Sequence, residues 1–267
     1  MAEIAFHKYH GAGNDFIVID NRKKLFPEKN YKLIEQLCDR RFGIGADGLL
    51  LLNKSKAHDF EMGYYNADGK PGSMCGNGGR CIVYFAKQAG INKKKFVFTA
   101  ADGIHQATLI SENAKTCTAV VKLKMNDVQQ IEKCEKDFFL NTGSPHYVRF
   151  VNDPSKINVM EEGMKIRNSK PFKAKGTNVN FVVAIGNEIF IRTYERGVEN
   201  ETLACGTGIT AAAICAVFSG RIPFSKKVKV TAMGGKLHVY LNKTENAFTD
   251  IYLEGGAQKV SEGLINI

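Results

Sequence analysis

Two cysteines in this chain each begin the pattern Cys-Gly-x-Gly: Cys75 in "CGNGGRC" and Cys205 in "CGTGITA". If such a turn opens a helix, the unpaired N–H groups and positive end of that helix lower the pKa of the thiol and can hold a carboxylate. Each thiol is therefore a candidate thiolate. With a thiolate and a thiol on opposite sides of one carbon, a proton could leave one face and return to the other, which is two-base epimerisation.

Other interpretations of the two turns stay open at this point. The turns could simply start helices or hold a phosphate, although neither ends in the Gly-Lys-Ser/Thr of a Walker sequence. The thiols could also form a redox pair, which requires Cα atoms within about 7 Å of each other. No CxxC pair is present, which argues against a disulfide scaffold or a four-thiolate zinc site. Five further cysteines are expected to fill the core: Cys38, Cys81, Cys117, Cys134 and Cys215.

The elements that must position the two cysteines recur in the same order along the chain. Residues 75–90 and 205–220 are predicted as helices with a glycine at each end. A strand entering a polar turn precedes each cysteine, at 60–69 and 189–197, and a strand pair with a Gly turn follows each helix, at 96–110 and 228–241.

This repeated order of elements predicts an α+β fold of two pseudo-symmetric homologous halves that meet near residues 120–130. Each half is expected to be a mostly antiparallel sheet wrapped around a central helix, with the active site in the cleft between the halves. An alternating βαβ nucleotide fold fits less well, because hairpin signals outnumber crossover helices. A smaller amphipathic helix is expected at 31–43.

Composition narrows the class of protein. The chain has 267 residues, 44% of them hydrophobic, and a net charge of +10. Its lysines are scattered along the chain, and the two segments richest in lysine, 92–96 and 225–229, follow predicted helices. We therefore expect no nucleic-acid partner, and the charge is suited to attracting an acidic metabolite. The N-terminal residues form no apolar signal segment and no window suits a membrane span, so we expect a cytoplasmic protein without a membrane partner.

Seven ordered motifs over nearly the whole length closely resemble the diaminopimelate epimerase family. This family interconverts LL- and meso-diaminopimelate without pyridoxal phosphate, on the route to lysine and peptidoglycan. The resemblance implies two domains, 1–125 and 126–257, a last strand at 258–267 that returns to complete the first, and a homodimer. The motifs are "HGAGNDF" (10–16), "RRFGIGADG" (40–48), "NADG" (66–69), "MCGNGGRC" (74–81), "GSPH" (143–146), "TNVNF" (177–181) and "YERGVENETLACGTG" (194–208).

The resemblance also implies roles for individual residues. Cys75 and Cys205 would be the base and acid pair, with no cofactor and no metal. His146 and Glu195 would assist proton exchange or hold the ionisation of the thiols. Substrate would be bound by Asn14, Asn66, Gly76, Asn77, Asn178, Glu195, Arg196, Gly206 and Thr207, of which Arg196 suits a distal carboxylate.

Two positions depart from the family pattern, because Gly48 stands where some members have Gln and Ser144 where many have Asn. The segment "GVENET" is also one residue longer than in some members. Proline racemase and hydroxyproline epimerase-like enzymes share the expected fold, but their substrates have one carboxylate. Arg196 and the asparagines favour a substrate with two amino-acid ends, and a thiol redox protein is the alternative from another class.

Overall fold

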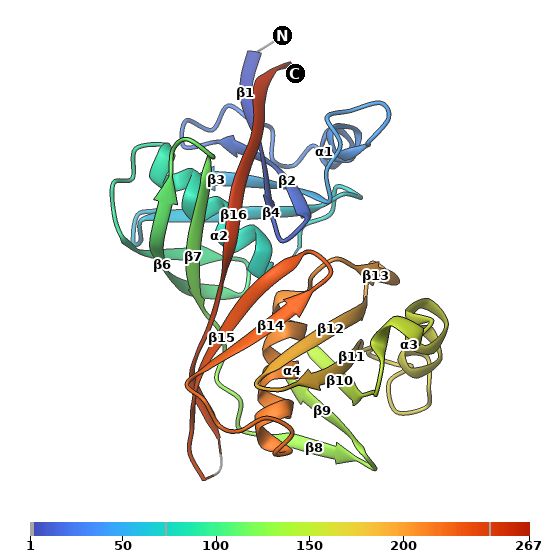
Figure 1. Cartoon of the computed structure of the whole chain (residues 1–267). Coiled ribbons are helices and arrows are strands. Elements are labelled where there is room, and N and C mark those ends of the chain that lie inside the picture. The colour runs from blue at the N-terminus through green and yellow to red at the C-terminus, as the bar shows by residue number, and fades with distance from the viewer. Residues whose placement is uncertain (1–2, 73, 246) are drawn as a thin grey trace. The chain divides into compact units, whose positions relative to one another are not determined.

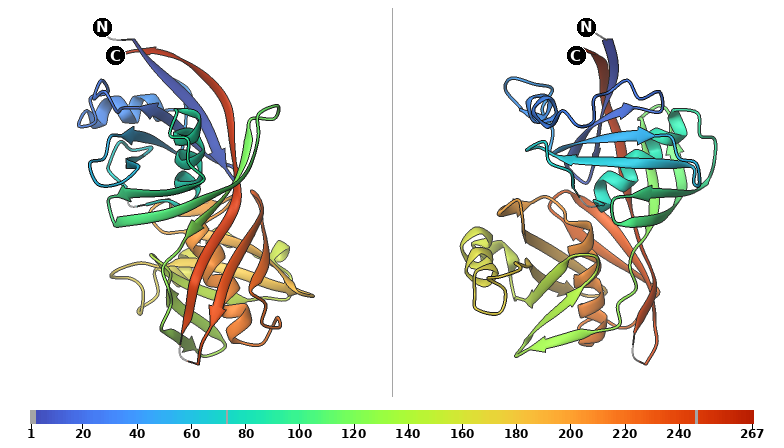
Figure 2. Two further views of the ribbon diagram at one scale, coloured as in Figure 1. Left: turned by 90° about the vertical axis from the view of Figure 1, so that its left-hand side faces the viewer. Right: turned by 180° about the vertical axis from the view of Figure 1, so that it is seen from behind.

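The computed structural model describes residues 3–72, 74–245 and 247–267 (Figure 1). The chain divides into two compact units: the first contains the residues up to Leu123 together with Gly255–Ile267, and the second contains Lys124–Glu254. In each unit one helix is enclosed by strands, α2 in the first and α4 in the second (Figure 2). The long final strand β16 (Phe248–Asn266) contributes its start to the second unit and its remainder to the first.

In the first unit, eight strands close into a ring around α2 (Gly76–Gln88). Neighbouring strands follow chain order, and β16 pairs with both β7 and β1, so the ring has no free edge. The enclosed helix buries every residue from Gly76 to Ala86. The strands are β1 (Glu3–Gly11), β2 (Asn14–Asp20), β3 (Gly48–Asn53), β4 (Phe60–Asn66), β5 (Lys95–Ala100), β6 (Gly103–Asn113), β7 (Thr118–Lys124) and the end of β16.

The second unit surrounds α4 (Gly206–Phe218) in the same way. A bridge between Val128 and Phe248, together with a hydrogen bond from Met125 N–H to Ile251 O, brings the segment before β8 against β16 and closes this ring. Besides the start of β16, its strands are β8 (Ile131–Cys134), β9 (Asp137–Asn141), β10 (Pro145–Phe150), β11 (Asn178–Ile185), β12 (Glu188–Glu195), β14 (Lys227–Ala232) and β15 (Gly235–Lys243), with β13 (Asn200–Thr202) beside β12.

The two units repeat one order of strand pairing. From β1/β2 to β6/β7 the pairs are antiparallel, parallel, antiparallel, parallel, antiparallel and antiparallel, and the pairs from β9/β10 to β15/β16 follow the same order. Each parallel pair needs a crossover, and each crossover holds a helix. The first crossovers hold α1 (Tyr31–Cys38) and α3 (Val159–Arg167), and the second hold α2 and α4. The expected α+β, mostly antiparallel fold is confirmed.

Two helices cover the outer faces of the parallel pairs. Ile34 on α1 packs with Leu49 and Leu51 of β3, while Leu50 points inward and would contact a side chain at position 78 of α2. Because both faces of β3 are covered, its leucines form an unbroken apolar run rather than an alternating one. On the second unit, Val159 of α3 packs in the same manner in an apolar cluster with strands β11 and β12.

Two local expectations need correction. The helix expected at 31–43 ends at Cys38, because Asp39 turns extended and its carboxylate accepts the backbone N–H groups of Arg41 and Phe42. All five further cysteines were expected to be buried in the core. This is confirmed for Cys38, Cys81 and Cys215, but Cys117 and Cys134 are only half-buried.

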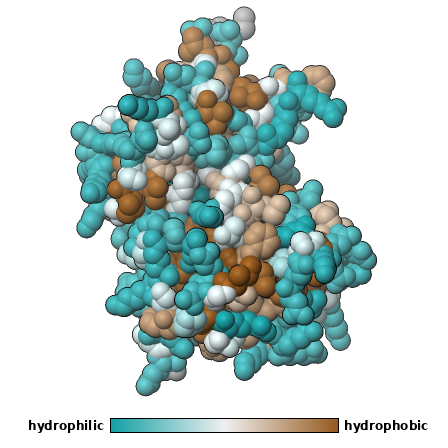
Figure 3. Space-filling view, viewed as in Figure 1, coloured by the Kyte–Doolittle hydropathy of each residue, from teal (hydrophilic) through white to brown (hydrophobic). Residues whose placement is uncertain are grey.

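Polar and charged side chains cover most of the visible face of each unit, with apolar residues between them (Figure 3). Scattered apolar side chains are ordinary on a folded surface. None of the helices in the described part of the chain has the length and apolar character needed to cross a membrane.

Candidate active site

Each of the two motif cysteines is the N-cap residue of the enclosed helix of its unit. Cys75 precedes α2 with φ −103° and ψ 125°, and Cys205 precedes α4 with φ −108° and ψ 113°. Neither N-cap cysteine makes a side-chain hydrogen bond to the first turn of its helix. The two thiols therefore occupy equivalent positions, each at the positive end of a helix dipole.

Burial disfavours the ionised form of four other thiols in the chain. Burial raises the pKa of Cys81 to about 12 and that of Cys38 to about 12, and it also raises the pKa of Cys215 and Cys134. A thiolate is thus disfavoured at these four positions. Cys75 is partly exposed, whereas Cys205 retains 7% of its accessible surface.

In the first unit, Asn14 at the start of β2 faces Cys75. Its Oδ1 lies 3.6 Å from Cys75 Sγ and accepts a hydrogen bond from Asn77 Nδ2 at 3.3 Å. Its Nδ2 donates to Asp47 Oδ2 at 2.7 Å, which fixes the amide with its carbonyl toward the thiol. The structure thus brings Asn14 and Asn77, two of the predicted substrate-binding residues, together with Cys75.

Charges beneath Asn14 form a balanced cluster of two cations and two carboxylates. Arg40 contacts both Asp15 and Asp47 at 2.6 Å, and Lys8 contacts Asp15 at 2.7 Å. Burial alone would raise the pKa of Asp15, but hydrogen bonds from Arg40 and Lys8 outweigh it and hold that pKa well below its usual range. Asp15 therefore stays ionised, and the hydrogen bond from Asn14 to Asp47 attaches Asn14 to this cluster.

Arg80 is a buried cation one turn into α2. It is wholly buried, and its guanidinium donates to Asn77 Oδ1 at 2.7 Å, to Gly76 O at 3.1 Å and to Gly256 O at 3.3 Å. These contacts set the amide orientation of Asn77 and attach β16 to the start of the helix. Sequence reasoning missed Arg80, although an arginine within the apolar run of this helix was a signal that it must find internal acceptors.

In the second unit, a hydroxyl and an imidazole lie beside Cys205. Thr207 Oγ1 is 3.4 Å from Cys205 Sγ and 2.8 Å from His146 Nε2. Burial lowers the pKa of His146 to about 3, and the positive charge of Arg196 acts in the same direction. His146 is therefore neutral at physiological pH. Asn180 Nδ2 lies 3.1 Å from the other ring nitrogen, Nδ1.

Asn178 and Arg196 form a second group at the same end of this unit. Asn178 Nδ2 donates to Ser144 Oγ at 2.9 Å and to Pro145 O at 3.0 Å, and its Oδ1 accepts the backbone N–H of Arg196 at 2.9 Å. The guanidinium of Arg196 donates to Lys175 O at 3.0 Å and to Ser144 Oγ at 3.4 Å, with the rest of its donors at an exposed surface. Such an oriented, exposed fork is suited to a carboxylate.

Two predicted site residues, Glu195 and Asn66, lie at strand ends. Glu195 ends β12, and its Oε2 accepts a hydrogen bond from Thr202, three residues before Cys205. Asn66 ends β4 opposite Gly48, and in the described residues no side-chain hydrogen bond joins it to the Asn14 group. At Gly48 an added Cβ would lie 2.5 Å from the Tyr65 carbonyl oxygen, which explains why no side chain stands there.

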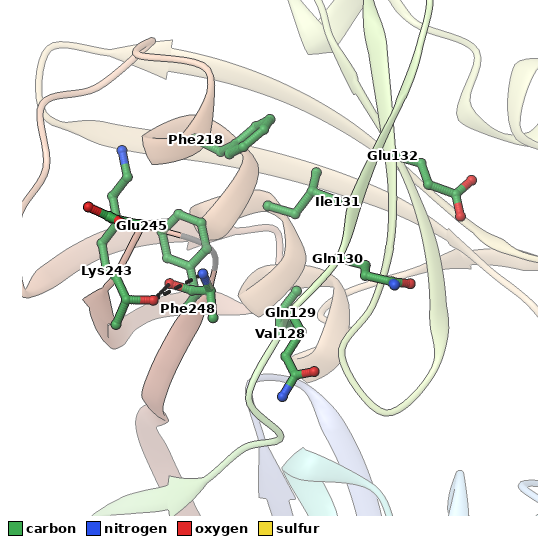
Figure 4. A pocket seen from close by; sticks show the side chains of 11 residues that line it. Val128, Gln129, Gln130, Ile131, Glu132, Phe218, Lys243, Glu245 and Phe248 are labelled. Atoms are coloured by element: carbon green, nitrogen blue, oxygen red, sulfur yellow. Dashed lines mark hydrogen bonds between the residues drawn. The ribbon is translucent and has the colours of Figure 1, made fainter.

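A pocket of about 710 Å³ lies at the opposite end of α4 from Cys205 (Figure 4). Phe218, the last helical residue, and Phe248 line it, and none of the predicted site residues does. Thirteen residues of helix place it about 20 Å from the thiol. The pocket is therefore separate from the candidate active site. Within the described ranges, no cluster of three or more His, Cys, Asp or Glu is arranged to hold a metal ion.

Comparison with known proteins identifies close relatives. The family model described as diaminopimelate epimerase matches residues 6–131 and 138–260. A protein of Flavobacterium psychrophilum named diaminopimelate epimerase is 50% identical over 260 residues, 97% of this chain and 99% of its own length. One of Chlorobaculum tepidum with the same name is 44% identical over 263 residues, 96% and 99% of the two chains.

Solved structures with low identity share the fold. A PhzF-family phenazine biosynthesis protein of Bacillus anthracis aligns with a TM-score of 0.76 at 15% identity, covering 100% of both chains. A hydroxyproline epimerase from Agrobacterium vitis, solved with trans-4-hydroxy-L-proline, aligns with a TM-score of 0.70 at 13% identity over 98% of this chain and 92% of its own. At this identity the likeness concerns the two-domain fold alone.

Proposed function

This chain belongs to the diaminopimelate epimerase family, and we propose that it interconverts LL- and meso-diaminopimelate by moving a proton between Cys75 and Cys205. Its relatives at 50% and 44% identity carry that name, so the chain is an isomerase. The observation that carries the mechanism is the equivalence of the two thiols, each the N-cap of the enclosed helix in its unit.

In the proposed reaction, a thiolate takes the α-proton from one face of the substrate and becomes a thiol. The electron pair left on the α-carbon is delocalised into the carboxylate. The second thiol then gives its proton to the opposite face and becomes the thiolate, which inverts the centre. The roles of Cys75 and Cys205 exchange with the direction of reaction, and the steps involve neither pyridoxal phosphate nor a metal.

Charge that develops on the carboxylate needs donors that are already in place. The first N–H groups of the two helices supply them in this proposal: Gly76 and Asn77 from α2, and Gly206 and Thr207 from α4. Their peptide dipoles are fixed by the helices, so no reorganisation is required as charge develops. This arrangement acts in place of a cofactor as an electron sink.

The remaining contacts select a substrate with a second amino-acid end. Arg196, held by Lys175 O and Ser144 Oγ, would bind the distal carboxylate. Asn14, Asn66, Asn178 and Glu195 would provide the polar contacts, and His146 and Glu195 would adjust the ionisation of the thiols. A hydroxyproline or proline substrate would leave the guanidinium without a partner, which is the reason to prefer diaminopimelate over the alternative substrates.

Several broader features belong to the same proposal. The two units would be homologous domains, which their common order of strand pairing supports. The protein would act in the cytoplasm as a homodimer, in the synthesis of lysine and peptidoglycan precursors. Nucleic acid and membranes would not be partners.

Incubation with LL-diaminopimelate in deuterated water tests the reaction directly. We expect meso product with deuterium at one α-carbon and no requirement for added cofactor. The same assay with L-proline and trans-4-hydroxy-L-proline is the comparison. Inversion of proline but not of diaminopimelate would refute the substrate assignment, and an absolute requirement for pyridoxal phosphate would refute the two-thiol chemistry.

A further inference from the structure

A buried chain of polar side chains leads to Cys205 from the middle of strand β11. Its members are Asn180, His146 and Thr207, and Asn180 and His146 are wholly buried. Asn180 stands in the otherwise apolar run "NFVVAI", where an unsatisfied amide would be costly. The mechanism proposed above gives Asn180 no role, so its place beneath the active site requires a separate explanation.

The orientation of the Asn180 amide is fixed by its neighbours. Its Nδ2 lies 2.9 Å from Tyr147 O, which can only accept, and its Oδ1 accepts from Thr193 Oγ1 at 3.1 Å. The second hydrogen of Nδ2 therefore points to His146 Nδ1, 3.1 Å away. Nδ1 must accept this hydrogen bond, so the neutral imidazole carries its proton on Nε2.

The rest of the chain follows from that tautomer. His146 Nε2–H donates to Thr207 Oγ1 at 2.8 Å, so this hydroxyl has its own proton free to donate. Cys205 Sγ lies 3.4 Å from this oxygen and can accept that proton. Asn178 Nδ2 is 3.4 Å from Nε2, but both of its hydrogens are used by Ser144 and Pro145. All donors thus point in one direction and end at sulfur.

In the first unit, apolar residues stand at the positions that correspond to His146 and Asn180. His146 and Phe16 each begin the ladder of the first parallel strand pair in their unit, and Asn180 and Leu50 lie two residues further along the adjoining strand. The polar chain under Cys205 is thus replaced by two apolar side chains in the first unit. There Cys75 Sγ faces the fixed carbonyl oxygen of Asn14, which accepts a proton rather than donating one.

We infer that Asn180 and the Thr207 hydroxyl are positioning residues, which hold His146 as its Nε2–H tautomer and direct a hydrogen bond at the Cys205 thiolate. A hydrogen bond to the charged form favours ionisation, so Cys205 loses its proton at a lower pH than it would without the chain. This inference rests on the proposed function, because it concerns one of the two thiols that function invokes. It makes the two thiols chemically different although their helices are equivalent.

Other ionisable groups near this chain are unchanged by the test below. Glu195 ends β12 and Arg196 follows it, and neither residue is changed in any variant. Strand β11 carries no ionisable residue. Several charged side chains on the other strands around α4 form ion pairs: Asp137 with Arg149, Lys229 with Glu188, Arg192 with Glu201, and Lys227 and His238 with Glu254. The remaining charged side chains on these strands, Glu132, Lys133, Lys236, Lys243 and Asp250, are also unchanged in every variant.

Peptide-resolved alkylation with iodoacetamide across pH measures the ionisation of both thiols in the full-length protein without substrate. In Thr207→Val we expect the midpoint for Cys205 to rise by about one pH unit, the effect of losing one hydrogen bond to an anion, with the midpoint for Cys75 unchanged. Thr207→Ser retains the hydroxyl, so its Cys205 midpoint should equal that of the wild-type protein. Asn180→Leu, which copies Leu50, should raise the Cys205 midpoint as well.

Nitrogen NMR of His146 in the wild-type protein tests the tautomer without any substitution. We expect a protonated Nε2 and an unprotonated Nδ1 from pH 6 to 9. An Nδ1–H tautomer, an imidazolium, or a Cys205 midpoint that Thr207→Val does not move would overturn the inference. Both readouts are independent of turnover, so a wild-type protein that fails to invert diaminopimelate would count against the proposed function instead.

Discussion

His146 and Phe16 occupy the same place in their units, as the first residues of the parallel ladders β10/β11 and β2/β3. One is a buried neutral imidazole and the other a buried apolar ring. The repeated backbone therefore supports different side-chain environments beneath the two helix starts. The effects of this difference can be tested by making the same substitution at equivalent positions of the two units.

The glycines at the third position of the two helices give a matched test. A Cβ at Gly208 would lie 2.5 Å from Asn180 Oδ1, whereas a Cβ at Gly78 would lie 3.4 Å from Leu50 Cδ2, an ordinary contact. We expect Gly208→Ala to lower the free energy of unfolding by about 1–3 kcal/mol through overpacking. Gly78→Ala should change it by less than about 1 kcal/mol, since alanine favours the helix. Urea denaturation of both variants measures the difference, and equal effects would contradict it.

The buried imidazole predicts a pH dependence of stability. The pKa of His146 falls from its ordinary 6.5 to about 3 on folding, so the unfolded state binds more protons between these values. Stability from this group is complete above about pH 6.5 and is lost as pH falls toward 3, with a slope of about 1.4 kcal/mol per pH unit. Comparing wild type with His146→Phe by urea denaturation between pH 7 and 5 isolates this slope, because most carboxylates stay ionised there. Parallel curves for the two proteins would be inconsistent with a neutral buried His146.

Substitution of Gly48 tests whether the glutamine that some family members have at this position could fit in this chain. Because an added Cβ would lie 2.5 Å from the backbone oxygen of Tyr65, Gly48→Gln should destabilise the first unit by about 1–3 kcal/mol rather than restore a substrate contact. Gly256→Ala is the control, since no atom lies within 4 Å of a Cβ added there. Thermal unfolding would show the difference, and a Gly48→Gln protein as stable as wild type would disprove the steric explanation.

Much of the fold could be predicted because local chemistry marks it. Glycines after Cys75 and Cys205 marked the helix starts, and Gly103 and Gly235, with φ of 131° and 136°, marked the hairpin turns. The helix α3 was not predicted, although α1 in the same place of the first half was. Its sequence, "VMEEGMKIR", is short and buries few residues, so it has little apolar periodicity to detect.

The site was predictable only where a residue stands near a motif glycine or cysteine. Arg80 and Asn180 were missed because each has a partner far away in the sequence. Arg80 donates to Gly256 O as well as to the nearby Asn77 and Gly76, and Asn180 contacts His146. A polar residue inside an apolar element signals that a partner exists, but the sequence does not identify that partner. The tautomer of His146 depends on three such contacts and required the structure.

Substituting each cysteine tests the assignment of the reacting pair. Cys75→Ser and Cys205→Ser replace a thiol by a hydroxyl whose pKa is far too high for a base at neutral pH. Each should lower the rate of epimerisation by at least about 10²–10⁴-fold, the usual contribution of a positioned acid–base group. Cys81→Ser and Cys215→Ser, at wholly buried thiols, should affect stability more than turnover. If Cys81 proves as necessary for turnover as Cys75, the pairing is wrong.

A substrate analogue with a leaving group on the β-carbon separates the two proton transfers. After a base removes the α-proton, such an analogue loses its leaving group, so reprotonation from the opposite face is not required. A protein with one working thiol should therefore still eliminate from the stereoisomer whose α-proton faces that thiol. Cys75→Ser retains Cys205 and Cys205→Ser retains Cys75, so the two variants should eliminate from opposite stereoisomers while neither epimerises diaminopimelate at a normal rate. Following release of the leaving group from each pure stereoisomer gives the rates, and wild type should act on both. If both variants prefer the same stereoisomer, one base serves both faces, and the proposal that Cys75 and Cys205 flank a single α-carbon fails.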